Sequence, residues 1–170
     1  MEVNTKFLEL ACAKAWEYQG LTYPNPAVGA AVVKDGVLIS CEAHKEAGLP
    51  HAEVEALKSA FFVLSNDEKQ KEQLSKLKSS HEIHDFLKQN ATSMFCECDI
   101  YVTLEPCSHE GRTPSCAALL SVLKPKTVVI GTMEQNSEAI GGAKMLEDSG
   151  ISVVKQKNEA CDELVEPFFM

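Results

Sequence analysis

The sequence predicts an α/β protein of three layers, in which a mixed five-stranded sheet carries helices on both faces. Residues 28–41 contain two apolar runs joined by Lys34-Asp35-Gly36, and this pattern predicts an antiparallel hairpin. Residues 100–104 are rich in β-branched and aromatic side chains, which predicts a central buried strand. Residues 127–154 read as strand, helix and strand, and this order predicts a parallel crossover.

Length and charge restrict the class of protein. A chain of 170 residues can bury one well-formed core, so we expect a single domain over residues 1–170. The net charge of −9 argues against a general nucleic-acid-binding surface, and no apolar run reaches transmembrane length. The odd count of seven cysteines and the absence of a signal-peptide pattern predict a reducing, cytoplasmic location.

Apolar periodicity predicts the main helices. Residues 5–19 form an amphipathic pattern that Asn4 or Thr5 caps and that Gly20 closes. A second helix is expected from Ala52 to about Leu64. Residues 156–170 read as a C-terminal helix with an apolar tail, which we expect to meet a further domain or a neighbouring subunit.

Residues 65–90 are mostly charged and helix-favouring, and they predict a surface insertion of one or two helices capped by Ser65 or Asn66. His81 and His84 are spaced as a metal pair could be, but without a third nearby ligand we interpret them as structural. Cys96 and Cys98 fit no redox or zinc spacing and are also interpreted as structural. The expected packing side comprises Leu74, Leu77, Ile83, Phe86 and Leu87.

Three side chains predict a metal site. One imidazole and two thiolates, from His51, Cys107 and Cys116, form a donor set that suits zinc and leaves a fourth position for water. Glu53 lies two residues after the histidine and is placed to move protons at that water. Pro50 is expected to be the first residue of the helix that carries His51 and Glu53.

The helix that carries Cys116 is also expected to start beside the predicted metal site. Thr113 is predicted to be its N-cap and Pro114 its first residue, so Cys116 would fall in its first turn. Glu105 ends the central strand and is interpreted as a buried hydrogen-bonding brace for the metal loop rather than a second base.

These motifs resemble a known family. The His51-Ala52-Glu53 motif followed by Pro106-Cys107 and a second cysteine resembles the zinc-dependent deaminases of the cytidine deaminase-like superfamily. The long gap to Cys116, with Ser-His-Glu-Gly-Arg-Thr-Pro inside it, resembles the deaminase domain of the bifunctional riboflavin-biosynthesis deaminase/reductase. Residues 40–43 and 133–137 depart from the pattern of that family.

The resemblance implies roles for four more residues. Asn25 would contact the pyrimidine, His44 would lie near the ribose phosphate, and His109 and Arg112 would bind the substrate and its phosphate. A plain loop or surface role is the alternative for each. His109 could also replace Cys116 as a zinc ligand, although Cys116 holds the helix-start position.

The resemblance implies zinc-dependent hydrolytic deamination of 2,5-diamino-6-ribosylamino-4(3H)-pyrimidinone 5′-phosphate, a riboflavin precursor. One alternative is a deaminase for guanine, cytosine or a tRNA adenosine, and another is a structural zinc module with His109 as fourth ligand. The expected cofactor is Zn²⁺. The expected partners are the small-molecule substrate and either a second copy of the chain or a following reductase domain, with neither nucleic acid nor membrane.

Overall fold

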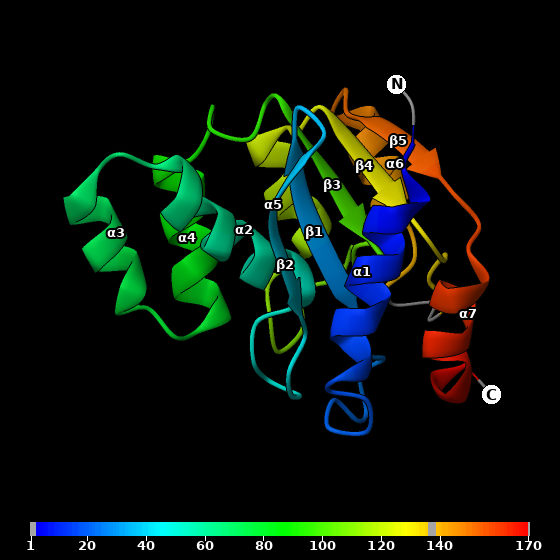
Figure 1. Ribbon diagram of the computed structural model, residues 1–170. Helices are drawn as coiled ribbons and strands as arrows, with labels where there is room; N and C mark the ends of the chain where they lie inside the picture. The colour runs from blue at the N-terminus through cyan, green and yellow to red at the C-terminus, as the bar shows by residue number, and fades with distance from the viewer. Residues whose placement is uncertain (1–2, 136–138, 170) are drawn as a thin grey trace.

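A five-stranded mixed sheet forms the centre of the computed structural model, which describes residues 3–135 and 139–169 (Figure 1). The strands lie in the order β2-β1-β3-β4-β5, so β3 is central as the sequence predicts. Helices cover both faces of the sheet, and the predicted three-layer α/β/α class is confirmed. The strand bounds are β1 Gly29–Lys34, β2 Val37–Ala43, β3 Cys98–Val102, β4 Thr127–Ile130 and β5 Ser152–Lys155.

The pairing of the strands follows from their connections. Strands β1 and β2 form the predicted antiparallel hairpin, in which Asp35 and Gly36 both have positive φ, as a tight two-residue turn requires. Strand β1 is also antiparallel to β3, whereas β3, β4 and β5 run parallel through helical crossovers. The loops before β1 and after β2, β3 and β4 therefore meet at one end of the sheet.

Two helices from opposite ends of the chain cover one face of the sheet. Helix α1 (Thr5–Trp16) begins at the predicted N-cap Asn4, but it ends earlier than the predicted boundary at residue 19. Helix α7 (Glu159–Val165) packs beside it and leads into a short 3₁₀ turn, η1 (Glu166–Phe168). The side chains of this layer form a separate apolar cluster with the inward residues of β1 and β3.

The other face carries a larger core. It is covered by α2 (Ala52–Leu64), α4 (Ser80–Asn90), α5 (Cys116–Leu123) and α6 (Gly142–Asp148). The second predicted helix matches α2 at both ends. The predicted strand–helix–strand crossover is also present as β4, α6 and β5.

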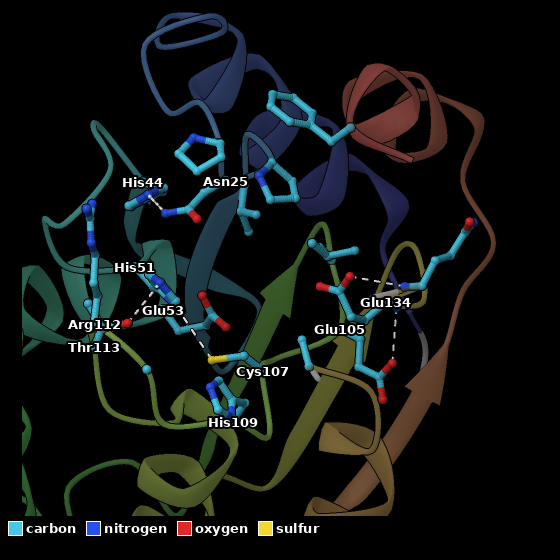
Figure 2. Close-up of a pocket in the computed structure, with 18 of the residues that line it drawn as sticks. Asn25, His44, His51, Glu53, Glu105, Cys107, His109, Arg112, Thr113 and Glu134 are labelled. Atoms are coloured by element: carbon cyan, nitrogen blue, oxygen red, sulfur yellow. Dashed lines mark hydrogen bonds between the residues drawn. The ribbon is translucent and has the colours of Figure 1, made fainter. Parts of the chain in front are cut away.

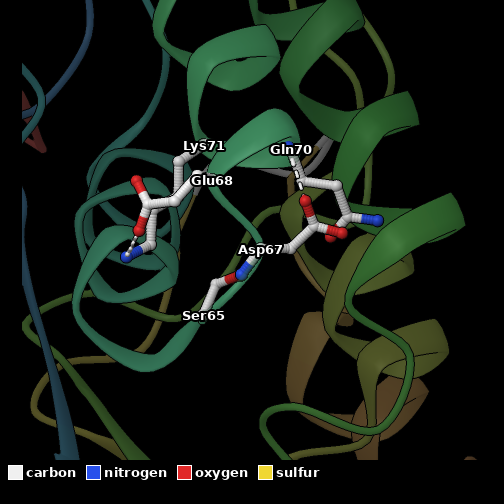
Figure 3. A network of polar contacts seen from close by, with 5 residues as sticks. All are labelled: Ser65, Asp67, Glu68, Gln70 and Lys71. Atoms are coloured by element: carbon white, nitrogen blue, oxygen red, sulfur yellow. Dashed lines mark hydrogen bonds and ion pairs between the residues drawn. The ribbon is translucent and has the colours of Figure 1, made fainter.

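The charged segment 65–90 contains two helices, where one or two were expected, and both contribute side chains to the larger core. Helix α3 (Glu68–Ser75) is capped by Asp67, not by Ser65 or Asn66, because the Asp67 carboxylate accepts from the Gln70 N–H at 3.0 Å (Figure 3). Helix α3 contributes Leu74 to that core, and α4 contributes Ile83, Phe86 and Leu87. All five predicted packing residues contact that core, namely Leu74, Leu77, Ile83, Phe86 and Leu87.

Within the described residues, no helix is both long and apolar enough to cross a membrane.

Candidate active site

A cavity of about 670 Å³ lies at the end of the sheet where the loops converge. The loop before β1 and the loops after β2, β3 and β4 all contribute to its lining, and Figure 2 shows the side chains that point into it. All the predicted site residues except Cys116 line this cavity. The group comprises Asn25, His44, His51, Glu53, Cys107, His109 and Arg112.

The structure brings the three predicted metal ligands together. His51 Nδ1 lies 3.7 Å from Cys107 Sγ and 3.6 Å from Cys116 Sγ, and the three candidate ligand atoms all lie within 4.8 Å of one another. His51 is the N-cap of α2, and Cys116 is the first residue of α5. Two helix N-termini therefore meet at this cluster, where their free N–H groups favour thiolate sulfur.

The predicted N-cap of the helix that carries Cys116 was wrong by two residues. Helix α5 is capped by Ser115, whose hydroxyl accepts from Ala118 N–H at 3.1 Å and donates to the Cys107 carbonyl at 2.8 Å. Thr113 lies outside the helix, and its Oγ1 is 3.1 Å from His51 Nε2. Thr113 is therefore placed to fix the orientation of the imidazole ring, a contact that the sequence analysis missed. Pro50 likewise precedes α2 and is not its first residue.

The two cysteines form an asymmetric hydrogen-bonded pair. The Cys116 thiol donates to Cys107, and this hydrogen bond, with a further contribution from His51, lowers the pKa of Cys107. The backbone N–H of Cys116 points at the same sulfur, at 3.4 Å. Cys107 is thus held ready as a thiolate, the form that binds a metal.

Glu53 lies beside the sulfur pair and is almost completely buried, with 4 % of its surface exposed. Burial raises the pKa of Glu53 to about 7, since water no longer stabilises its charged form. A carboxyl group with a pKa near neutrality can both accept and release a proton at physiological pH.

Glu105 has the predicted role of a brace. Its two carboxylate oxygens accept from the backbone N–H groups of Glu134, at 3.1 Å, and Ala143, at 2.9 Å (Figure 2). Gly142 permits a second close contact with the metal loop, because a Cβ atom there would lie 1.7 Å from the Pro106 carbonyl oxygen. The loop that carries Cys107 is therefore clamped against the start of α6.

His44 and Asn25 form a linked pair on the pocket wall. His44 Nδ1 lies 3.1 Å from the Pro50 carbonyl oxygen, which can only accept, so Nδ1 carries the proton. Its Nε2 then accepts from the Asn25 side-chain amide at 3.2 Å (Figure 2). Both ring nitrogens are occupied within the protein, and no donor among the described residues reaches the Asn25 amide oxygen. Burial lowers the pKa of His44 to about 4, which keeps the ring neutral.

His109 and Arg112 lie at the exposed rim of the cavity. Within the ranges 3–135 and 139–169, no carboxylate forms an ion pair with Arg112. His109 is not part of the His51–Cys107–Cys116 cluster. The rim thus places the planar cation of Arg112 in the same cavity as buried Glu53 and the His51–Cys107–Cys116 cluster.

Phe168 and Phe169 also line the cavity, a placement that the sequence analysis did not predict. The apolar tail indicated only that these side chains needed some cover. Residue 170, which the predicted tail also includes, lies outside the described residues.

Comparisons with known proteins agree with this geometry. A family model described as the cytidine and deoxycytidylate deaminase zinc-binding region matches residues 1–132. The chain is 37% identical over 170 residues to the riboflavin biosynthesis protein RibD of Aquifex aeolicus, covering 99% of this chain and 39% of the relative. It is 36% identical over 171 residues to the riboflavin biosynthesis protein PYRD, chloroplastic, of Arabidopsis thaliana, covering 99% and 33%.

Solved structures show the same likeness. The Thermotoga maritima diaminohydroxyphosphoribosylaminopyrimidine deaminase/5-amino-6-(5-phosphoribosylamino)uracil reductase superimposes with a TM-score of 0.73 at 34% identity, covering 96% of this chain and 39% of that one. The chain thus spans less than two fifths of the length of these relatives. The predicted resemblance is confirmed.

Proposed function

Because the chain belongs to the cytidine and deoxycytidylate deaminase zinc-binding family, we propose that it is a zinc-dependent hydrolase acting on 2,5-diamino-6-ribosylamino-4(3H)-pyrimidinone 5′-phosphate. The observation that carries this proposal is the placement of buried Glu53 beside the His51–Cys107–Cys116 cluster, in a cavity with Arg112 at its rim. The names of the relatives from Aquifex and Thermotoga support the same pathway and substrate.

The donor set of the cluster fits zinc. His51, Cys107 and Cys116 supply one nitrogen and two sulfurs on rigid helix starts, and they leave one tetrahedral position free. Zinc in such a site lowers the pKa of a bound water to about 7 and so supplies a nucleophile at neutral pH. The contact of His51 Nε2 with Thr113 keeps Nδ1 free to act as the ligand atom.

Glu53 moves the protons of the reaction. Its carboxylate accepts a proton from the attacking water and returns it to the pyrimidine ring nitrogen next to the carbon under attack. It then transfers the second proton of the water to the departing amine, so that ammonia leaves and a ring carbonyl remains. The raised pKa of Glu53, about 7, suits a group that must both take up and give back a proton.

Asn25 orients the pyrimidine, and His44 orients Asn25. The hydrogen bond from the Asn25 amide to His44 Nε2 directs the amide oxygen toward a donor on the base. His44 therefore acts as a positioning residue, and the phosphate contact implied for it by resemblance is better assigned to His109 and Arg112. Both lie at the exposed rim, where a phosphate keeps part of its hydration.

The remaining predicted partners are part of this proposal. Reduction of the deaminated product would fall to a reductase, either a domain following this chain or a separate protein. The cytoplasm, or another reducing compartment, suits a chain whose seven cysteines are all free.

An ammonia-release assay tests the proposed function. The zinc-loaded protein is supplied in turn with the diaminopyrimidine ribosyl phosphate, its dephosphorylated form, cytosine, guanine and a tRNA bearing the target adenosine. We expect turnover of the phosphorylated diaminopyrimidine and its loss after chelation. Preference for another base would assign a different deaminase, and zinc binding without turnover of any substrate would support a structural zinc module.

A further inference from the structure

The C-terminal helix α7 is fixed against the rest of the molecule close to the active site. Cys12 Sγ on α1 lies 3.2 Å from Cys161 Sγ on α7, and the side chain of Gln19, which follows α1, donates to the Leu164 carbonyl of α7 at 3.1 Å. Asp162 accepts a hydrogen bond from the Thr132 hydroxyl. The position of α7 therefore determines where the turn η1 that follows it lies.

Thr132 links this helix to the metal loop. While its side chain holds Asp162, its backbone carbonyl accepts from the N–H of Glu105 at 2.8 Å. Glu105 in turn braces the loop that carries Cys107. A continuous set of hydrogen bonds thus connects α7 with the floor of the cavity.

Phe168 and Phe169, just after α7, line the same cavity as His51 and Glu53. Both are half-buried, so part of each apolar side chain is open to solvent. Phe169 also borders a neighbouring hollow with Thr132 and Gln135. This position places Phe169, with Phe168 next to it in the chain, at the end of the cavity where Gln135 and its neighbour Glu134 lie.

That end of the cavity lies opposite Arg112, which is proposed to bind the phosphate of the substrate. Figure 2 shows Arg112 and Glu134 on opposite sides of the pocket, with Glu53 and Cys107 between them. A substrate whose phosphate is at Arg112 and whose reacting carbon is beside Glu53 presents its base, not its ribose, to the far wall. An apolar wall there removes the base from water without competing for its hydrogen bonds.

We propose that Phe168 and Phe169 form the wall that contacts the pyrimidine ring and contribute to specificity for a planar base. This inference rests on the proposed function for the identity of the base. Aromatic side chains that contact a base through its face or edge improve binding with little dependence on its hydrogen-bonding pattern. The pair therefore favours a planar heterocycle, while Asn25 selects among heterocycles.

The test is a set of phenylalanine variants of the full chain. Phe168→Ala and Phe169→Ala remove each ring, Phe168→Leu retains apolar volume, and Phe62→Ala is the matched control. Phe62 is also a half-buried phenylalanine, but it lies on α2 and does not line the cavity. Circular dichroism and zinc content confirm that each variant is folded and loaded.

Binding is measured apart from turnover. Each substitution is also made in a Glu53→Gln background, and calorimetry gives the Kd of the diaminopyrimidine ribosyl phosphate and of ribose 5-phosphate. We expect each alanine variant to weaken binding of the pyrimidine compound on the order of tenfold, Phe168→Leu to weaken it less, and ribose 5-phosphate to bind unchanged. In the active protein KM should rise with little change in kcat.

Several results would overturn the inference. Unchanged affinity in both alanine variants, or an equal loss for the two ligands, would remove the pair from the base-binding wall. A wild-type protein that binds the pyrimidine compound but releases no ammonia would instead contradict the proposed function. In that case the change in Kd between variant and wild type, for each of the two ligands, still tests the inference about the phenylalanines. Failure of the Glu53→Gln protein to bind the pyrimidine compound would overturn both the proposed function and the inference about the phenylalanines.

Discussion

His51 Nε2 lies 3.1 Å from the Thr113 hydroxyl, while Nδ1 of the same ring faces the sulfurs of Cys107 and Cys116. A hydrogen bond on one ring nitrogen fixes both the tautomer and the angle at which the other nitrogen meets a metal. Thr113 is therefore placed to orient His51 Nδ1 toward a metal held by the cluster.

Replacing Thr113 by valine should weaken zinc binding. Valine keeps the shape of the side chain but removes the hydroxyl, and loss of such an orienting contact typically lowers metal affinity about 10- to 100-fold. Competition with a zinc chelator measures this affinity. Thr113→Ser retains the hydroxyl and is the control, so equal affinity in the valine and serine variants would contradict the assigned role.

Replacing Glu53 by glutamine should abolish turnover without removing zinc. The amide is similar in size but cannot accept and return a proton, and loss of a general acid/base group lowers the rate about 10²- to 10⁴-fold. Ammonia release and zinc content are measured together. Glu55→Gln, on the same helix but paired with Lys45 at 3.3 Å, is the control; near-normal activity of the Glu53 variant would exclude the proposed role.

Replacing Arg112 by alanine should affect phosphorylated substrate selectively. A hydrogen bond to a charged group contributes about 1.5–3 kcal/mol, so KM should rise roughly 10- to 100-fold for the phosphate ester. The dephosphorylated compound should show little change, and Lys144→Ala, at an exposed position of α6 that does not line the cavity, should change neither value. An equal rise of KM for both compounds would place Arg112 in the support of the loop and not at the phosphate.

Buried His84 should make the free energy of unfolding decrease in acid. The side chain is 1 % exposed on α4, and neither ring nitrogen has a hydrogen-bond partner among the described residues. Burial lowers the pKa of His84 from 6.5 to about 4. Between these two values the unfolded chain binds a proton that the folded protein does not, so the free energy of unfolding falls as the pH falls through this window.

Replacing His84 by leucine should remove that contribution. The difference in free energy of unfolding between the variant and the wild type should grow by about 3 kcal/mol from pH 7 to pH 4. Denaturant unfolding of zinc-loaded protein at a series of pH values measures it. His81→Leu, at an exposed position three residues earlier, is the control; parallel curves for wild type and His84→Leu would contradict the account.

The sequence predicted the sheet and the metal cluster because each depends on local patterns. The Asp35-Gly36 turn, the β-branched run before Glu105, and the His51-Ala52-Glu53 and Pro106-Cys107 motifs are all short-range signals. The capping residue of α5 could not be predicted in the same way. Both Thr113 and Ser115 suit an N-cap, and the contacts with His51 and with the Cys107 carbonyl decide between them.

The aromatic wall also depends on contacts between distant segments. Nothing near Phe168 and Phe169 in the sequence indicates a binding role, because an apolar tail is equally typical of an interface. Their position follows from α7, which Cys12, Gln19 and Thr132 hold in place from other parts of the chain. Likewise, the engagement of both His44 nitrogens required the folded positions of Pro50 and Asn25.

X-ray absorption at the zinc edge, on purified protein loaded with zinc, tests the central claim most directly. An open site built by His51, Cys107 and Cys116 predicts one zinc per chain with two sulfurs at about 2.3 Å, one imidazole nitrogen and one oxygen at about 2.0–2.2 Å. A second imidazole, a third sulfur or the absence of bound zinc would contradict it.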